Sequence, residues 1–188
     1  MSDEHTEFSC IILAGGRGTR MQGCDKGLVE FRGRALIEHV LDRVAPQVSD
    51  IVISANRNLP RYQSYGYPVV PDSIDGFTGP LAGIASALPK CRHDWVLVTP
   101  CDMPHLPDNL VTSLRDGRYN EPLVAVAVDD RLQLVFLLQR DLLSSINTFL
   151  QSGQSRVMTW LQSQMYRRVD FSKPENAFYN LNTFADLE

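Results

Sequence analysis

An apolar run that leads into a glycine-rich, basic loop constrains this chain more than any other stretch. Residues 10–13 have the length and composition of a buried strand. Residues 14–26 follow with four glycines, two arginines and one lysine. Glycine lets backbone N–H groups approach a ligand closely, and arginine and lysine supply forked donors and compact positive charge. A strand that leads into such a loop predicts a phosphate-binding site.

Two common phosphate-binding loops do not match. The Walker pattern requires Gly-Lys-Ser/Thr, whereas Gly23 is followed by Cys24 and Asp25. The dinucleotide fingerprint requires a third glycine after Gly18, where this chain has Met21. The loop therefore indicates neither a P-loop NTPase nor a simple dehydrogenase.

Apolar runs alternate with amphipathic segments along the chain. In the first half, the pattern predicts strands at 10–13, 28–31, 51–53, 69–70 and 95–98, and helices at 36–44, 60–65 and 79–88. In the second half, it predicts strands at 123–128, 132–138 and 166–171, and helices at 110–114, 142–150 and 156–161. The two aspartates at 129–130 predict a tight, antiparallel connection between two of these strands. We therefore expect one α/β domain over residues 1–188, with a mostly parallel central sheet and a small antiparallel insertion.

Polar or glycine residues follow several of these strands directly. Gly15, Ser54, Asp72 and Asp102 each lie just beyond a predicted strand end. Parallel sheets bind ligands in the crevice beyond the carboxyl ends of their strands, and Mg²⁺ prefers one or two carboxylates together with phosphate oxygens. The alternative for both aspartates is an ordinary turn, which aspartate also favours.

Composition limits the classes of function. The chain has 188 residues, 44% apolar, and a net charge of −4, which does not favour binding to nucleic acid. It has no apolar run of about 20 residues and no secretory signal at its N-terminus, so we expect no membrane association and a cytoplasmic location. Its four cysteines lack a C-x-x-C pair, which favours free thiols over a zinc site.

The loop nevertheless resembles a known signature. Residues 13–16 (Leu-Ala-Gly-Gly), Arg20-Met21 and Lys26 resemble the nucleotide-binding motif of nucleotidyltransferases that activate sugars, isoprenoid alcohols and molybdopterin, and in particular the molybdenum cofactor guanylyltransferases. In that family Ala-Gly-Gly is the guanine-type form, whereas Ala-Ala-Gly is typical of cytidine transfer. The resemblance spans about residues 11–187 and implies a Rossmann-like, three-layer nucleotidyltransferase fold.

The chain departs from the family pattern at three places. The family usually has Met-Gly where this chain has Met21-Gln22, and often has asparagine at the position of Ser54. It also often has His-Pro in the strand where this chain has Gln133-Leu134.

The resemblance also implies roles for individual residues. Asp102, Lys26 and Arg20 would be catalytic, with Asp102 the ligand of Mg²⁺. Residues of the loop and of the strand ends would bind GTP: Leu13, Ala14, Gly15, Gly16, Lys26, Ser54, Asp72, Gly79, Gly83 and Asp102. Arg156, Asn180 and Asn182 would face the molybdopterin, since asparagine can match the edge of a pterin ring and arginine a phosphate. A helix cap or turn residue is the alternative for Asn182.

The implied reaction transfers GMP from GTP to the terminal phosphate of Mo-molybdopterin and releases pyrophosphate. The implied partners are GTP, Mo-molybdopterin, and proteins that deliver molybdopterin or mature molybdoenzymes. Two alternatives stay open. One is a related nucleotidyltransferase that uses CTP or a sugar or alcohol phosphate acceptor, and the other is a non-catalytic GTP-binding adaptor.

Overall fold

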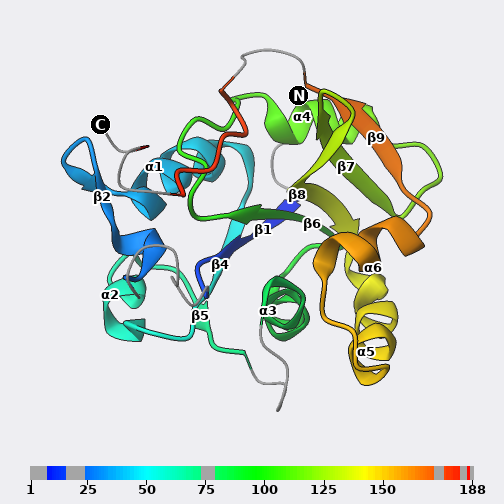
Figure 1. Ribbon diagram of the computed structural model, residues 1–188, viewed down its shortest axis with the longest axis horizontal. Helices are drawn as coiled ribbons and strands as arrows, with labels where there is room; N and C mark the ends of the chain where they lie inside the picture. Colours follow the sequence, from blue (N-terminus) through cyan, green and yellow to red (C-terminus); the bar gives the residue numbers. More distant parts are fainter. Residues whose placement is uncertain (1–7, 16–23, 73–78, 172–175, 183–185, 187–188) are drawn as a thin grey trace.

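The computed structural model describes residues 8–15, 24–72, 79–171, 176–182 and 186. A seven-stranded sheet forms its centre, and a two-stranded sheet, β2 (Glu30–Phe31) with β3 (Arg34–Ala35), lies beside it (Figure 1). The central strands run in the order β5 (Val69–Val70), β4 (Asp50–Ser54), β1 (Phe8–Leu13), β6 (Trp95–Pro100), β8 (Arg131–Gln139), β7 (Leu123–Val128) and β9 (Arg167–Asp170). The mostly parallel α/β fold predicted from the sequence is thus confirmed.

Strand β1 lies near the middle of the sheet because it is buried along its whole length and is apolar except for Ser9, whose hydroxyl donates to Oδ2 of Asp50 at 2.8 Å. It pairs in parallel with β4 on one side and with β6 on the other. Its side chains alternate between two cores, with Cys10 and Ile12 in one and Ile11 and Leu13 in the other. This alternation is what a strand covered on both faces requires.

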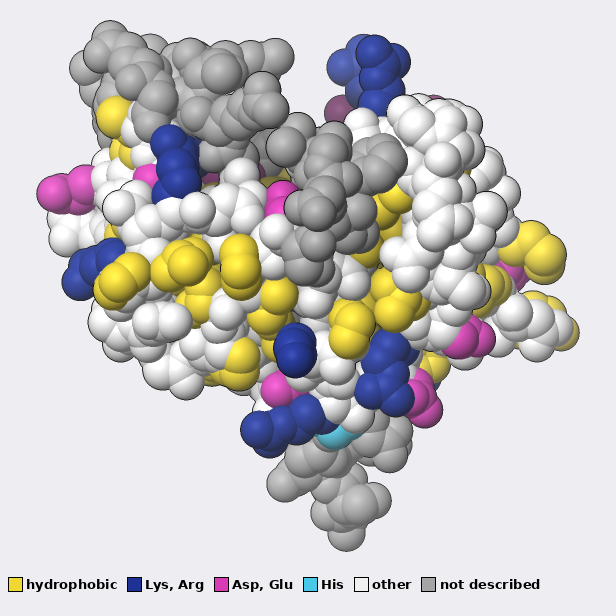
Figure 2. Space-filling model, turned by 90° about the horizontal axis from the view of Figure 1, so that it is seen from below, with side chains coloured by type: hydrophobic (Ala, Val, Ile, Leu, Met, Phe, Trp, Pro, Cys, Tyr) yellow, Lys and Arg dark blue, Asp and Glu magenta, His cyan; other side chains and the backbone are white. Residues whose placement is uncertain are grey.

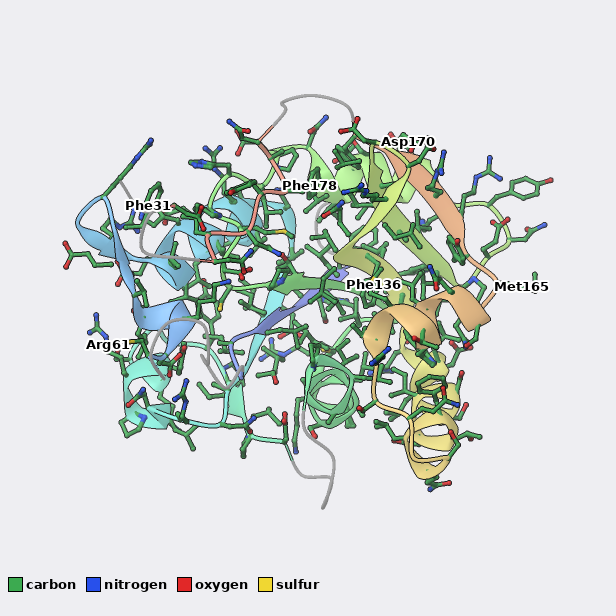
Figure 3. The ribbon with its side chains drawn as sticks, viewed as in Figure 1. Phe31, Arg61, Phe136, Met165, Asp170 and Phe178 are labelled. Carbon is green, nitrogen blue, oxygen red and sulfur yellow. The ribbon has the colours of Figure 1, made fainter. Side chains whose placement is uncertain are left out.

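Helices cover both faces of the sheet and make three layers (Figure 1). The first face carries α1 (Leu36–Val44), α2 (Leu59–Gln63) and α4 (Leu110–Asp116), whose buried side chains, except Leu36, belong to the core of Cys10 and Ile12. The other face carries α3 (Pro80–Ala87), α5 (Leu143–Gln151) and α6 (Val157–Ser163), which pack on the core of Ile11 and Leu13. In the second core, Phe136 lies 6.5 Å from Trp160 between ring centroids, in the interior seen in Figure 3.

Strands β7 and β8 form the predicted antiparallel hairpin. Asp129 and Asp130 connect them with φ values of 48° and 62°, the left-handed pair that favours Asp and Asn in tight hairpin turns. The hairpin extends the central sheet, because β8 pairs with β6 in the antiparallel direction. Residues 123–127 and 135–138 are buried, which suits interior strands covered on both faces.

The segment after the loop differs from the expected strand at 28–31. It begins as a 3-10 turn, Lys26–Leu28, and only Glu30–Phe31 pairs as β2. The hairpin to β3 turns through Arg32 and Gly33, both with positive φ. The strand is short because the 3-10 turn occupies the chain as far as Leu28, and because its partner β3 ends where α1 begins at Leu36.

The described residues were considered for a charged surface patch and for a membrane-spanning helix. Among the described residues, Lys and Arg side chains on the face seen in Figure 2 are scattered between polar and apolar atoms. None of the described helices combines the length and apolar character needed to cross a bilayer.

Candidate active site

The carboxyl ends of β1, β4, β5 and β6 surround a cavity of about 190 Å³. Two hydrogen bonds hold three of these ends together: the amide of Ala14 donates to the carbonyl of Ser54 (2.7 Å), and the amide of Cys101 donates to the carbonyl of Leu13 (3.1 Å). The lining residues are Leu13, Ala14, Gly15, Lys26, Ser54, Asp72, Gly79, Pro80, Gly83, Pro100, Cys101, Asp102 and Leu134. Every expected GTP contact within the described residues lines this cavity. Gly16 and Arg20 lie outside the described residues.

Lys26 and Asp102 meet at the rim of this cavity. The Lys26 ammonium forms an ion pair with Oδ2 of Asp102, and the two side chains are only 21% and 11% exposed. The same ammonium donates a hydrogen bond to Oδ1 of Asn182 at 2.7 Å. The amide of Leu181 donates to the carbonyl of Asp102 at 3.1 Å, which holds the C-terminal segment against the β6 end. The Lys26 ammonium is thus shared by two acceptors, Asp102 and Asn182, that are far apart in the sequence.

The second oxygen of Asp102 has no hydrogen-bond partner among the described residues. Its Oδ1 is buried, and no hydrogen-bond donor among the described residues reaches it. A buried carboxylate oxygen without a donor is costly unless a cation or a ligand satisfies it. Within the described segments, no three His, Cys, Asp or Glu side chains gather as a metal site. A cation at Asp102 would therefore need other oxygens from a ligand or water, as Mg²⁺ commonly has with phosphates.

Asp72 is held by Asn56, a residue that the sequence patterns did not single out as a contact. The Asn56 amide donates to Oδ2 of Asp72 at 2.9 Å, and the Asp72 backbone amide donates back to Oδ1 of Asn56 at 2.8 Å. Burial raises the pKa of the Asp72 carboxyl above its ordinary value, and the bond from Asn56 opposes that rise. In the sequence, Asn56 stands close after the predicted strand at 51–53, and the family that the loop resembles also has an asparagine at this position.

Gly83 lies so close to Ser54 and Asp72 that there is no space for a side chain at this position. A Cβ at this position would lie 2.5 Å from Oγ of Ser54 and 3.3 Å from Oδ1 of Asp72. Ser54 is itself buried, at 2% exposed, so its hydroxyl has little freedom to move away. Glycine is therefore required where the first turn of α3 approaches β4.

We expect Gly83→Ala to lower GTP affinity by about 10-fold or more, because the new methyl group displaces Ser54 and Asp72 at the cavity wall. Overpacking of this kind costs about 1–3 kcal/mol of folding free energy, so the variant is still expected to fold. Calorimetric titration with GTP and thermal unfolding measure the two effects. Ser54→Gly combined with Gly83→Ala removes the hydroxyl in the way and should recover part of the affinity. A double variant no better than the single one would contradict this explanation.

The residues expected on the molybdopterin side are only partly gathered. Asn182 contacts Lys26, and Asn180 lies in the same segment with a buried, unpartnered Oδ1. Arg156 is exposed at the N-cap position of α6 and does not line the cavity. The buried residues Val157, Trp160 and Leu161 place α6, because they pack on the second core.

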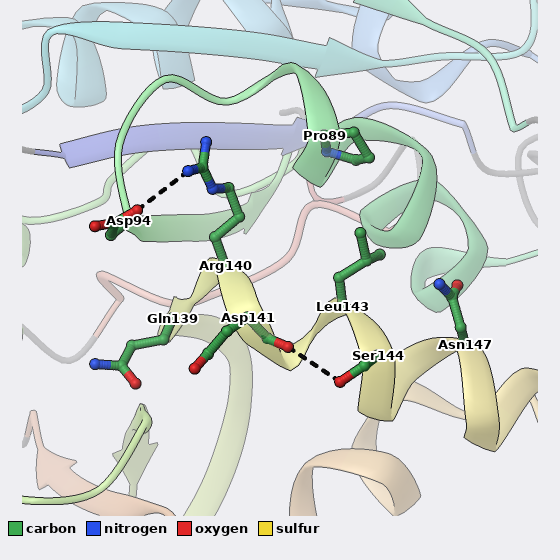
Figure 4. Close-up of a pocket in the computed structure, with 8 residues that line it drawn as sticks. All are labelled: Pro89, Asp94, Gln139, Arg140, Asp141, Leu143, Ser144 and Asn147. Carbon is green, nitrogen blue, oxygen red and sulfur yellow. Dashed lines mark hydrogen bonds and ion pairs between the residues drawn. The ribbon is translucent and has the colours of Figure 1, made fainter.

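A larger and shallower pocket lies at the opposite end of β6, near the residue where that strand begins (Figure 4). Arg140 lines it and donates to Oδ1 of Asp94 at 3.2 Å and to the carbonyl of Cys91 at 2.9 Å. Its guanidinium is thus already engaged by the protein. None of the candidate site residues lines this pocket.

Comparison with known proteins places the chain in a family. The family model described as MobA-like NTP transferase domain matches residues 10–169. The molybdenum cofactor guanylyltransferase of Shewanella sp. (strain MR-4) is 42% identical over 180 residues, covering 94% of this chain and 91% of that protein. The molybdenum cofactor guanylyltransferase of Yersinia pestis (strain Pestoides F) is 44% identical over 180 residues, covering 95% and 92%.

A solved structure has the same fold. The molybdopterin-guanine dinucleotide biosynthesis protein A of Archaeoglobus fulgidus superposes with a TM-score of 0.79 at 22% identity, covering 95% of this chain and 94% of that chain. The similarity over almost the whole of both chains agrees with the nucleotidyltransferase fold that the resemblance implied. The chain belongs to the family of MobA-like NTP transferases.

Proposed function

We propose that this chain transfers GMP from GTP to the terminal phosphate of molybdenum-loaded molybdopterin and releases pyrophosphate. The names of relatives that are 40–44% identical over nearly the whole chain support the substrates. The observation that carries the proposal is the cavity that joins the glycine end of β1 to Lys26 and Asp102. A cation and a carboxylate with one unsatisfied oxygen suit a reaction between two anionic groups.

In the proposed reaction, an oxygen of the acceptor phosphate attacks the α-phosphorus of GTP. A new P–O–P bond forms, the bond from the α-phosphorus to the bridging β-phosphate oxygen breaks, and pyrophosphate takes that electron pair. The nucleophile is already an anion, so no strong general base is required. The protein must instead hold two negative groups in line and balance the charge that develops.

The described residues divide this work between two sides. The backbone amide of Gly15 and the Lys26 ammonium would hold the triphosphate, while Asp72 and the Gly79–Gly83 segment would hold the nucleoside. Asn180 and Asn182 would face the acceptor, since their segment lies against Asp102. Arg156 stays a prediction for the acceptor phosphate. Gly16 and Arg20 stay predictions for the loop.

Asp102 would hold a divalent cation, for which we propose Mg²⁺. The fit rests on its buried, unpartnered Oδ1, which would gain a partner, and on phosphate oxygens that would complete the coordination. When bound, the cation neutralises charge on the reacting phosphate. Delivery and maturation proteins as partners, and the cytoplasm as the location, are predictions of the same hypothesis.

The test is a nucleotide-selectivity assay. Pyrophosphate release is measured with Mo-molybdopterin and each of GTP, CTP, ATP and UTP, with acceptor-free reactions as the control. We expect release to depend on the acceptor and to be fastest with GTP. A clear preference for CTP would favour the related nucleotidyltransferase. Tight binding of GTP without any guanylylated pterin would favour the adaptor.

A pH effect is expected at Asp72. Its raised pKa means that the free protein keeps a proton on this carboxyl to a higher pH than an ordinary aspartate does. A donor on GTP that binds the carboxylate lowers the pKa again, so binding in mildly acid solution releases a proton and weakens as the pH falls. Calorimetry in two buffers of different ionisation heat measures the release. Asp72→Asn should release fewer protons than the wild type, and an identical release would refute the assignment.

A further inference from the structure

Residues 57–62 form hydrogen bonds to Cys24 and Asp25, near the end of the glycine-rich loop. The Tyr62 hydroxyl donates to Oδ1 of Asp25 at 2.5 Å, and the Asn58 amide donates to Oδ2 of the same carboxylate at 2.9 Å. One residue earlier, the Arg57 guanidinium donates to the carbonyl of Cys24 at 3.2 Å. Both oxygens of Asp25 are thus bound by one short segment, and the next residue in the chain is Lys26.

The two donors to Asp25 come from α2 and from its N-cap position. Asn58 is the N-cap residue of α2, where asparagine commonly caps the helix, but its side chain makes no cap bond and binds Asp25 instead. Tyr62 is fully buried, and burial, more than any neighbouring charge, raises the pKa of its hydroxyl. The hydroxyl therefore stays protonated and acts as a donor to Asp25.

The residue after Lys26 is also held against Tyr62. A Cβ at Gly27 would lie 2.6 Å from the Tyr62 hydroxyl oxygen and 3.3 Å from Sγ of Cys101. The backbone on either side of Lys26 is thus fixed, on one side by bonds to Asp25 and on the other by close packing of Gly27. From this position the Lys26 ammonium reaches both Asp102 and Asn182.

We propose that Asp25 is a positioning residue, and that Tyr62 and Asn58 act through it to place the Lys26 ammonium for the triphosphate. The inference rests on the proposed function, because it concerns how the chain prepares its phosphate-binding cation. Positioning before binding strengthens a contact, since less conformational entropy is lost when the ligand arrives. The bonds to Asp25 therefore act on GTP through Lys26 and not through contact with GTP.

The test is a double-mutant cycle between Tyr62→Phe and Lys26→Met, read as the dissociation constant of GTP with Mg²⁺ by calorimetry. Phenylalanine keeps the buried ring and removes only the hydroxyl. In the wild-type background we expect Tyr62→Phe to weaken GTP binding by about 10-fold. In the Lys26→Met background we expect a change of less than about 2-fold, because the group that is positioned is gone.

Tyr65→Phe is the matched control. Tyr65 follows α2 closely, and its hydroxyl likewise donates to a carboxylate, Oε1 of Glu38, at 3.0 Å. It should change GTP binding by less than about 2-fold in both backgrounds. Asn58→Gly is the second variant, because glycine tolerates the φ of 49° at this position and removes the amide. Its effect should also disappear when Lys26 is methionine.

Equal weakening of GTP binding by Tyr62→Phe in both backgrounds would overturn the proposal and indicate a merely structural role. No weakening in the wild-type background would also overturn it. Thermal unfolding of each variant separates loss of folded protein from loss of affinity. Wild-type GTP binding and guanylyl transfer are measured first, so that their absence is recognised as failure of the proposed function. Normal wild-type behaviour with an additive cycle rejects the positioning role alone.

Discussion

Asp102→Ala is expected to lower the rate of guanylyl transfer by about 100-fold or more and to leave the fold intact. Losses of this size follow removal of one group that stabilises charge in the transition state. The fold should survive because the side chain is at the edge of the sheet and one of its oxygens has no partner. Pyrophosphate release at saturating GTP, Mg²⁺ and acceptor measures the rate, and circular dichroism with thermal unfolding measures the fold.

Asp108→Ala is the control for this change. Asp108 lies in the same connection between β6 and α4, but its side chain is 80% exposed and pairs with Arg43 on the surface. Its removal is expected to change the rate by less than about 2-fold, since exposed ion pairs contribute little. Near-normal turnover by Asp102→Ala with Mg²⁺ would refute the role of Asp102.

Lys26→Met should lower kcat/KM for GTP by about 100-fold, with a higher KM as well as a lower kcat. Methionine keeps much of the apolar stem but loses the charge that would balance the triphosphate. The change also leaves the mostly buried Asp102 carboxylate without its cation, which is expected to cost about 1–3 kcal/mol of folding free energy in the absence of ligand. Steady-state kinetics and urea unfolding without nucleotide measure the two effects.

Two further variants sharpen this prediction. Lys26→Arg should recover little activity, because a planar guanidinium is larger than the ammonium that contacts Asp102 and Asn182. Lys90→Met removes an exposed lysine in the turn after α3 and should behave as the wild type. An unchanged kcat/KM in Lys26→Met would remove Lys26 from the proposed mechanism.

Much of the site was predictable because its parts follow local rules. An apolar run of four residues predicted β1, and three polar or acidic residues beyond strand ends were expected to meet at one edge of a parallel sheet. Gly15, Ser54, Asp72 and Asp102 all line one cavity there. The rule succeeded because parallel strands necessarily bring their carboxyl ends together, whatever their separation in the chain.

Other parts could not be predicted, because they depend on which surfaces pack against each other. The antiparallel hairpin of β7 and β8 was predicted, but the strand with which it pairs was not, and in the structure β8 pairs with β6. Arg156 was grouped with Asn180 and Asn182, yet the packing of α6 leaves it exposed at a helix end outside the cavity. The contacts of Asn58 and Tyr62 with Asp25 also depend on the position of α2 relative to the loop. The bonds between Asn56 and Asp72 depend on the pairing of β4 with β5.

The sequence by itself determined the class of fold, the edge of the sheet where a ligand would bind and the family, because apolar periodicity and the glycine loop are local patterns. Only the tertiary structure decided that Lys26 is shared between Asp102, 76 residues away, and Asn182, 156 residues away. It also decided that no hydrogen-bond donor among the described residues reaches Oδ1 of Asp102. The physical reason is that the packing of helices and loops on the sheet brings together side chains that are distant in the sequence. A local sequence pattern contains no information on that packing.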